Sequence, residues 1–176
     1  MSKAILERGE TKSCYMLSLG CPKNRVDSEL VKSAMEERGH VFVSEPAQAQ
    51  IILINTCGFI QPAVEESVDA ILEAGALRQN GRLSALVVLG CLAQRYGAEL
   101  AESLPEVDLF VGCSELGRLL ELLEAETNER CHCSAKPSYL PPGPWVRPSS
   151  LGSHAAYVKV AEGCDRRCAF CTVPQI

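Results

Sequence analysis

Short apolar runs alternate with amphipathic stretches over the first 125 residues of this 176-residue chain, and this alternation restricts the fold more than any other feature. Apolar runs of strand length occur at residues 14–19, 41–43, 51–55, 85–89 and 109–111. Helical spacing of apolar residues occurs between them, at residues 25–38, 62–79, 94–102 and 115–125. Strands that alternate with helices form βα units, which build a parallel sheet with right-handed crossovers. The sequence therefore predicts an α/β fold: a doubly wound, flavodoxin- or Rossmann-like domain with a five-stranded parallel sheet over residues 13–125.

The expected ends of the first two helices carry recognisable signals. Asn24 precedes the first helical pattern, and asparagine is a residue type that caps helix N-termini. Gly39 follows the last turn of the same pattern, where glycine is common. Pro62 suits the first turn of the second helix.

The chain after residue 125 has a different character. Five prolines stand from Pro137 to Pro148 with little periodicity, which is typical of an extended, semi-rigid spacer. Residues 126–153 are therefore predicted to form a proline-rich linker. A new apolar run at residues 156–160 predicts the first strand of a second domain, which would occupy residues 154–176.

Composition excludes several classes of protein. No apolar run approaches the length of about 20 residues that spans a bilayer, so no membrane association is expected. The net charge of −5 argues against direct nucleic-acid binding, which needs a basic surface. The charged N-terminus lacks the apolar stretch of a signal peptide, so a cytoplasmic location is expected. In that reducing compartment, the ten cysteines indicate metal or redox chemistry rather than disulfides.

Three cysteines directly follow predicted strands, and we call them the strand-end cysteines: Cys21, Cys57 and Cys91. Because parallel strands end at one edge of the sheet, where open α/β folds bind ligands, these thiols are expected to converge. Each precedes a helix, whose positive end favours the metal-ligating thiolate. Neighbouring glycines allow close backbone approach: Gly20, Gly58 and Gly90.

The strand-end cysteines have alternative interpretations. Buried structural thiols are one alternative. Zinc, which usually takes four ligands, is another. Three thiolates favour an iron–sulfur cluster with one open iron.

A second set, the loop cysteines, has the spacing Cys-x3-Cys-x2-Cys: Cys164, Cys168 and Cys171. Three cysteines on one loop can ligate three irons of a four-iron cluster and leave the fourth iron open, whereas fourfold ligation is usual for electron transfer. An open iron invites a chelating cofactor. The spacing is that of radical S-adenosylmethionine enzymes, and Phe170, just before the last cysteine, is a candidate cofactor-binding residue. A chance triplet or a zinc knuckle is the alternative.

Four further cysteines are not assigned to either set. Cys14 lies inside a predicted strand and is expected in the core. Cys113 also follows a strand and is in principle a fourth ligand for the strand-end cysteines. Cys131 and Cys133 stand beside the linker without a second pair, and they are expected to be exposed thiols.

The segments around both cysteine sets resemble the radical-SAM methylthiotransferase family. Within it they resemble the N-terminal portion of the RimO type, the ribosomal protein aspartate methylthiotransferases, over about residues 12–176. The matching segments are residues 18–24 (SLGCPKN), 26–29 (VDSE), 55–60 (NTCGFI), 63–67 (AVEES) and 90–96 (GCLAQRY). Relatives that modify tRNA more typically have Gln-Met-Asn after the first cysteine, and an arginine where Phe59 stands here.

This resemblance implies two [4Fe–4S] clusters and S-adenosylmethionine as cofactors. The loop cysteines would hold the cluster that binds S-adenosylmethionine, and an electron donor would drive its cleavage to a deoxyadenosyl radical. The radical would take hydrogen from the β-carbon of an aspartate in small-subunit ribosomal protein twelve. The strand-end cysteines would hold an auxiliary cluster that carries the sulfur, which a second S-adenosylmethionine methylates before its transfer.

The family continues into a radical-SAM barrel, and a full (β/α)8 barrel takes about 250 residues. Only about 20 residues follow the linker, so residues 154–176 are expected to be the first strand and cluster loop of a truncated barrel, and the chain a fragment that is inactive alone. Two alternatives remain open at this point: a tRNA methylthiotransferase with the same clusters, and a non-catalytic iron–sulfur module.

Overall fold

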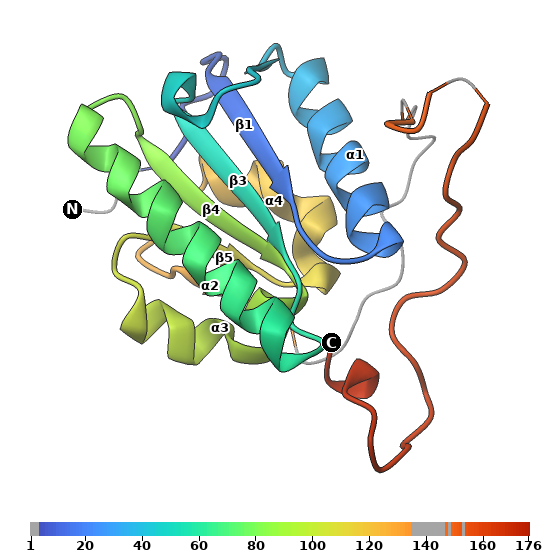
Figure 1. Ribbon diagram of the computed structural model, residues 1–176. Helices are drawn as coiled ribbons and strands as arrows, with labels where there is room; N and C mark the ends of the chain where they lie inside the picture. The colour runs from blue at the N-terminus through green and yellow to red at the C-terminus, as the bar shows by residue number, and fades with distance from the viewer. Residues whose placement is uncertain (1–3, 135–146, 148, 153) are drawn as a thin grey trace.

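The computed structural model describes residues 4–134, 147, 149–152 and 154–176, and within them a parallel sheet is covered by helices on both faces (Figure 1). The strand order is β2-β1-β3-β4-β5-β6. The strands are β1 (Ser13–Ser18), β2 (Val41–Phe42), β3 (Ile51–Thr56), β4 (Ala85–Gly90), β5 (Leu109–Val111) and β6 (Cys131–His132). The α-helices are α1 (Pro22–Glu37), α2 (Gln61–Ala76), α3 (Cys91–Ser103) and α4 (Leu119–Glu124). The first five strands have the flavodoxin-like order, so the predicted α/β class is confirmed.

A sixth strand corrects the predicted count of five. β6 lies within residues 126–153, for which the sequence predicts a linker, and it pairs in parallel with β5. Arg130, just before β6, holds this strand to the domain, because its guanidinium donates to three backbone carbonyls: those of Ala101, Leu104 and Val107. A two-residue strand made of cysteine and histidine carries no apolar run, so the hydropathy pattern does not indicate it.

Alternate residues of the central strands face opposite helical layers. One face packs against α1 and α4 and includes Leu53 and Val87, while the other packs against α2 and α3 and includes Ile54 and Val88. Figure 1 shows α2 and α3 on the near side of the sheet and α4 behind it. Every residue of β3 and β4 is buried, which explains their unbroken apolar runs. The domain is therefore doubly wound, as the sequence predicts.

Several helix bounds differ from the predicted ones. α1 begins at Pro22 with Cys21 as its N-cap, so the prediction that Asn24 caps this helix is wrong. Proline at the first helical position has its backbone φ already fixed for a helix, which favours the earlier start. α4 is shorter than predicted, because a 3-10 helix, η3 (Cys113–Arg118), occupies the first part of the expected helix.

The segment after the linker forms no strand in its described residues. Residues 156–160, predicted as a strand, are extended without a sheet partner, and Val158 and Val160 are 79% and 81% exposed. An isolated strand has nothing to satisfy its backbone hydrogen bonds, which is why an alternating pattern alone does not produce one. The proline-rich stretch from 137 to 148 lies outside the described residues except for Arg147. Among the described residues, no helix combines the length and apolar character that a membrane span requires.

Phe110 is expected to be a main contributor to stability. Its side chain on β5 is fully buried against the α2 and α3 layer. Phe110→Ala should lower the free energy of unfolding by about 3–5 kcal/mol, because it leaves a cavity in a close-packed core. Phe170→Ala, at a side chain that is 92% exposed, should change it by less than about 0.5 kcal/mol. Urea denaturation of both variants checks this difference, and equal effects would contradict the described core.

Candidate functional site

The strand-end cysteines lie at the carboxyl edge of the sheet. β1, β3 and β4 are adjacent and parallel. Cys21 is the N-cap of α1, Cys57 follows the last residue of β3, and Cys91 is the first residue of α3. The chain leaves β1 and β3 toward helices on opposite faces, so this edge includes the point where such sheets form their binding crevice.

Asn24 links two of these thiols. The thiols of Cys21 and Cys91 both approach its Oδ1 atom, at 3.9 and 3.7 Å. Its Nδ2 group donates to the backbone oxygens of Leu19 and Thr56, at 3.0 and 2.8 Å. These two bonds fix the buried amide, so it holds one acceptor between two thiols that are 70 residues apart in sequence. The sequence predicts only a helix-capping role for Asn24. No local sequence signal indicates that its amide oxygen lies between the thiols of Cys21 and Cys91.

Cys57 is buried beside the same group. A methyl group added to Gly20 would lie 2.7 Å from Cys57 Cβ and 3.1 Å from its Sγ, so the loop after β1 packs directly on this side chain. Ser67 of α2 fixes the backbone of Cys57: its hydroxyl accepts from the Cys57 N–H at 3.2 Å and lies 3.1 Å from the Cys57 oxygen. Cys57 is therefore held in place by both flanking elements.

The protonation of these thiols depends on their neighbours. Burial raises the pKa of Cys57, and the nearby Cys91 and Cys21 thiolates add to that effect. A hydrogen bond with Cys113 is the main cause that lowers the pKa of Cys91, against the opposing effect of burial. Cys113 thus contacts Cys91 at the end of the neighbouring strand. Its own pKa is raised, first by this hydrogen bond and then by burial.

The thiols at this edge are neighbours but are not gathered around a single point. Within the described ranges, no three His, Cys, Asp or Glu side chains form a group that could hold a metal ion. In a zinc site, each sulfur lies about 2.3 Å from the same ion. The possible metal ligands at this edge are the three strand-end sulfurs, and Cys113 lies next to one of them, Cys91.

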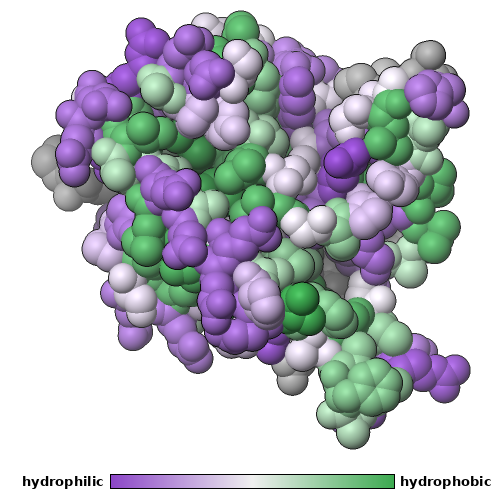
Figure 2. Space-filling model, viewed as in Figure 1, coloured by the Kyte–Doolittle hydropathy of each residue, from purple (hydrophilic) through white to green (hydrophobic). Residues whose placement is uncertain are grey.

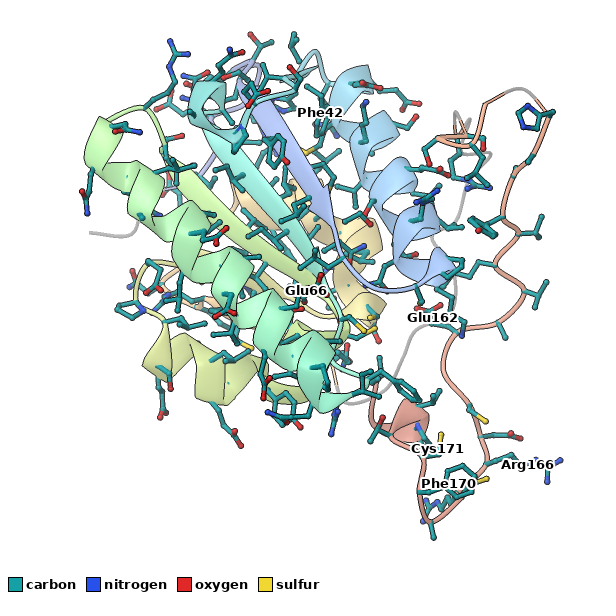
Figure 3. All side chains as sticks on the ribbon, viewed as in Figure 1. Phe42, Glu66, Glu162, Arg166, Phe170 and Cys171 are labelled. Atoms are coloured by element: carbon teal, nitrogen blue, oxygen red, sulfur yellow. The ribbon has the colours of Figure 1, made fainter. Side chains whose placement is uncertain are left out.

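The loop cysteines lie on the extended C-terminal segment. Figure 3 shows Cys171 and Phe170 near its tip, away from the sheet, and Figure 2 shows this tip projecting from the body. Cys164 and Cys168 are exposed and Cys171 is half-buried, while the Phe170 ring is 92% exposed. The structure does not gather these thiols into a metal-binding group. The hydroxyl of Thr172, next to Cys171, lies 3.4 Å from the Phe59 oxygen, two residues after Cys57.

The remaining cysteines have distinct environments. Cys14 is buried in the sheet as expected, and burial raises its pKa to about 12. Cys131 and Cys133 are half-buried, so the expectation of exposed thiols is wrong. Their sulfurs lie 3.4 Å apart against α3, where Gly97 leaves room for them. The formation of β6 turns both side chains toward this helix, which the sequence does not indicate.

Comparison with known proteins identifies relatives of this chain. Residues 13–112, more than half of the chain, match the family described as uncharacterized protein family UPF0004. A ribosomal protein uS12 methylthiotransferase RimO from Myxococcus xanthus is 46% identical over 171 residues, which are 97% of this chain and 36% of the relative. RimO of Anaeromyxobacter sp. (strain K) is 46% identical over 92% of this chain and 34% of its own length. RimO of Bdellovibrio bacteriovorus is 41% identical over 97% of this chain and 38% of its own.

The chain therefore spans about a third of the length of these curated relatives. The resemblance to the RimO type that the cysteine motifs indicate is confirmed over nearly the whole chain. By the match over its sheet domain, this chain belongs to protein family UPF0004.

Proposed function

We propose that this chain is part of a RimO-type methylthiotransferase and carries the ligands of two [4Fe–4S] clusters. The strand-end cysteines would hold an auxiliary cluster, and the loop cysteines would hold the cluster that binds S-adenosylmethionine, with Phe170 beside it. The observation that carries the proposal is the approach of Cys21 and Cys91 to one amide oxygen of Asn24, with Cys57 packed alongside. The names of the relatives support the methylthiotransferase activity.

The donor atoms at the sheet edge are of the type and number that such a cluster needs, although their sulfurs do not surround one point in this structure. Three thiolates ligate three of four irons and leave one open, which a reaction at the cluster requires. Cys21 and Cys91 stand at the N-terminal ends of α1 and α3, where free N–H groups and the helix dipole favour negative charge. The Asn24 amide oxygen approaches both thiols, and the Cys113 thiol is a hydrogen-bond partner of Cys91. The charges of Asp27 and Glu162 oppose the thiolate form of Cys91.

When bound, the clusters would supply the electron that cleaves S-adenosylmethionine and the sulfur that is transferred. The chain's own residues would hold and separate the two centres. Asn24 would keep Cys21 and Cys91 at a fixed spacing, and Ser67 would keep Cys57 in place. The substrate would be ribosomal protein uS12, as the names of the relatives indicate. The family resemblance implies that the modified residue is an aspartate and that an external electron donor is needed.

Anaerobic reconstitution with iron and sulfide tests this proposal. The chain should take up about eight irons and about eight sulfides, because each set of three cysteines would hold one four-iron cluster. After reduction, added S-adenosylmethionine should change the electron paramagnetic resonance (EPR) spectrum of the loop-cysteine cluster. An uptake of only about four irons would contradict the proposal that the chain holds two clusters. Eight irons without any response to S-adenosylmethionine would favour an electron-transfer module instead.

A further inference from the structure

Two acidic residues of the VDSE segment are buried on α1. Asp27 and Glu29 are each only 8% exposed, although both are carboxylates near the start of the helix. Burying a carboxylate is costly unless charged or hydrogen-bonding partners compensate it. The partners of both come from the described residues between 147 and 176, which we call the C-terminal segment, more than 110 residues away in sequence.

Asp27 pairs with Lys159. The Lys159 ammonium donates to both carboxylate oxygens, at 2.7 and 2.9 Å, and also pairs with Glu162. The side chains of Lys159 and Asp27 are each 10% exposed, so water screens this pair poorly. Burial lowers the pKa of Lys159, but the carboxylates of Asp27 and Glu162 raise it by more, so the pKa stays above its usual value. Figure 3 shows Glu162 on the C-terminal segment, beside the start of α1.

Glu29 anchors the same segment at a second point. Its Oε1 accepts from the backbone N–H and the hydroxyl of Ser150, at 2.8 and 2.6 Å, and its Oε2 accepts from Arg147. Arg147 in turn donates to the Tyr157 oxygen. Burial raises the pKa of Glu29, but the hydrogen bonds from Ser150 and Arg147 outweigh it and lower the pKa overall. The carboxylate is thus held charged against the segment.

Apolar packing contributes little to this attachment. Val158 and Val160 are largely exposed. A cavity of about 490 Å³ separates part of the segment from α1, η3 and α4, and Val158 and Lys159 lie on its wall. Hydrogen bonds and ion pairs join the described residues of this segment to α1, so polar groups fix its position.

We propose that Asp27 and Glu29 are positioning residues that dock the C-terminal segment on α1 and so fix where the loop cysteines lie relative to the strand-end cysteines. Asp27 stands six residues after Cys21, and Lys159 stands five residues before Cys164. The Thr172 contact with Phe59 holds the far end of the loop. The inference rests on the proposed function for its consequence, the spacing of the two clusters, but the docking itself can be tested without any iron.

The reactivity of lysine side chains tests the docking on the chain without iron. Under limiting acetylation followed by mass spectrometry, Lys159 should react at least about tenfold more slowly than the exposed Lys32, because it must first leave a buried ion pair. Asp27→Asn should bring the two rates close together. The matched control Glu36→Gln removes the exposed Lys32–Glu36 pair of the same helix and should leave Lys159 protected. Equal rates in the unaltered chain, or no change in Asp27→Asn, would overturn the docking.

Spin coupling between the two reduced clusters tests the positioning role. Lys159→Met should weaken the coupling, because it removes one of the two anchors of the segment, while iron remains at about eight per chain, because the substitution lies outside the sheet domain. The exchanged pair Asp27→Lys with Lys159→Asp should restore coupling, which a purely structural effect on α1 would not do. Unchanged coupling in Lys159→Met would refute the positioning role. Failure to load iron would instead count against the proposed function, and the lysine experiment would still report on docking.

Discussion

Replacing Cys57 with alanine should lower the iron bound after anaerobic reconstitution from about eight to about four per chain. Cys57 is one of three sulfurs at the sheet edge, and a four-iron cluster held by the remaining two would have two open irons. The loop cysteines lie on another segment and keep all three sulfurs. Iron and sulfide assays, with EPR of the reduced sample, should therefore report one cluster that still responds to S-adenosylmethionine.

Cys14→Ala is the matched control for this experiment. Cys14 is also a buried thiol on the sheet, on the strand that leads to Cys21, but it lies inside β1 and away from the carboxyl edge. This variant should retain about eight irons. Loss of all iron in Cys57→Ala would contradict two independent sites, and retention of all eight would exclude Cys57 as a ligand.

The parts of the fold that the sequence predicts are those encoded by local pattern. β3 and β4 are buried on both faces, so their apolar runs are continuous and mark them clearly. β6 has no such pattern, because its position depends on β5 and on the contacts of Arg130. The run at 156–160 gives the opposite error: it has strand composition but no neighbouring strand among the described residues.

The candidate site divides in the same way. The position of the strand-end cysteines at one edge follows from parallel strands, which is a rule about topology that the sequence can supply. The role of Asn24 cannot be predicted from such a rule, because it depends on contacts with Thr56 and Cys91, which only the fold brings near. Asp27 shows the same limit, since its partner Lys159 is 132 residues away.

Gly20→Ala should disrupt the proposed auxiliary cluster although it changes no cysteine. Gly20 has a φ of +85°, a left-handed conformation that costs an alanine about 1–2 kcal/mol. The added methyl group would also lie 2.7 Å from Cys57 Cβ, too close for any real contact, so Cys57 or the loop must move. Iron should fall to about four per chain, and the free energy of unfolding should drop by a further 1–3 kcal/mol or so from overpacking.

Gly81→Ala is the control that separates the backbone cost of a positive φ from the steric overlap with Cys57. Gly81 has a φ of +70°, but a methyl group there would meet nothing within 4 Å. This variant should therefore show only the backbone cost of about 1–2 kcal/mol in urea denaturation and should retain about eight irons. If both variants lose iron equally, general instability explains the loss. If Gly20→Ala keeps all its iron at normal stability, the loop after β1 does not hold Cys57 in the position that the auxiliary cluster needs.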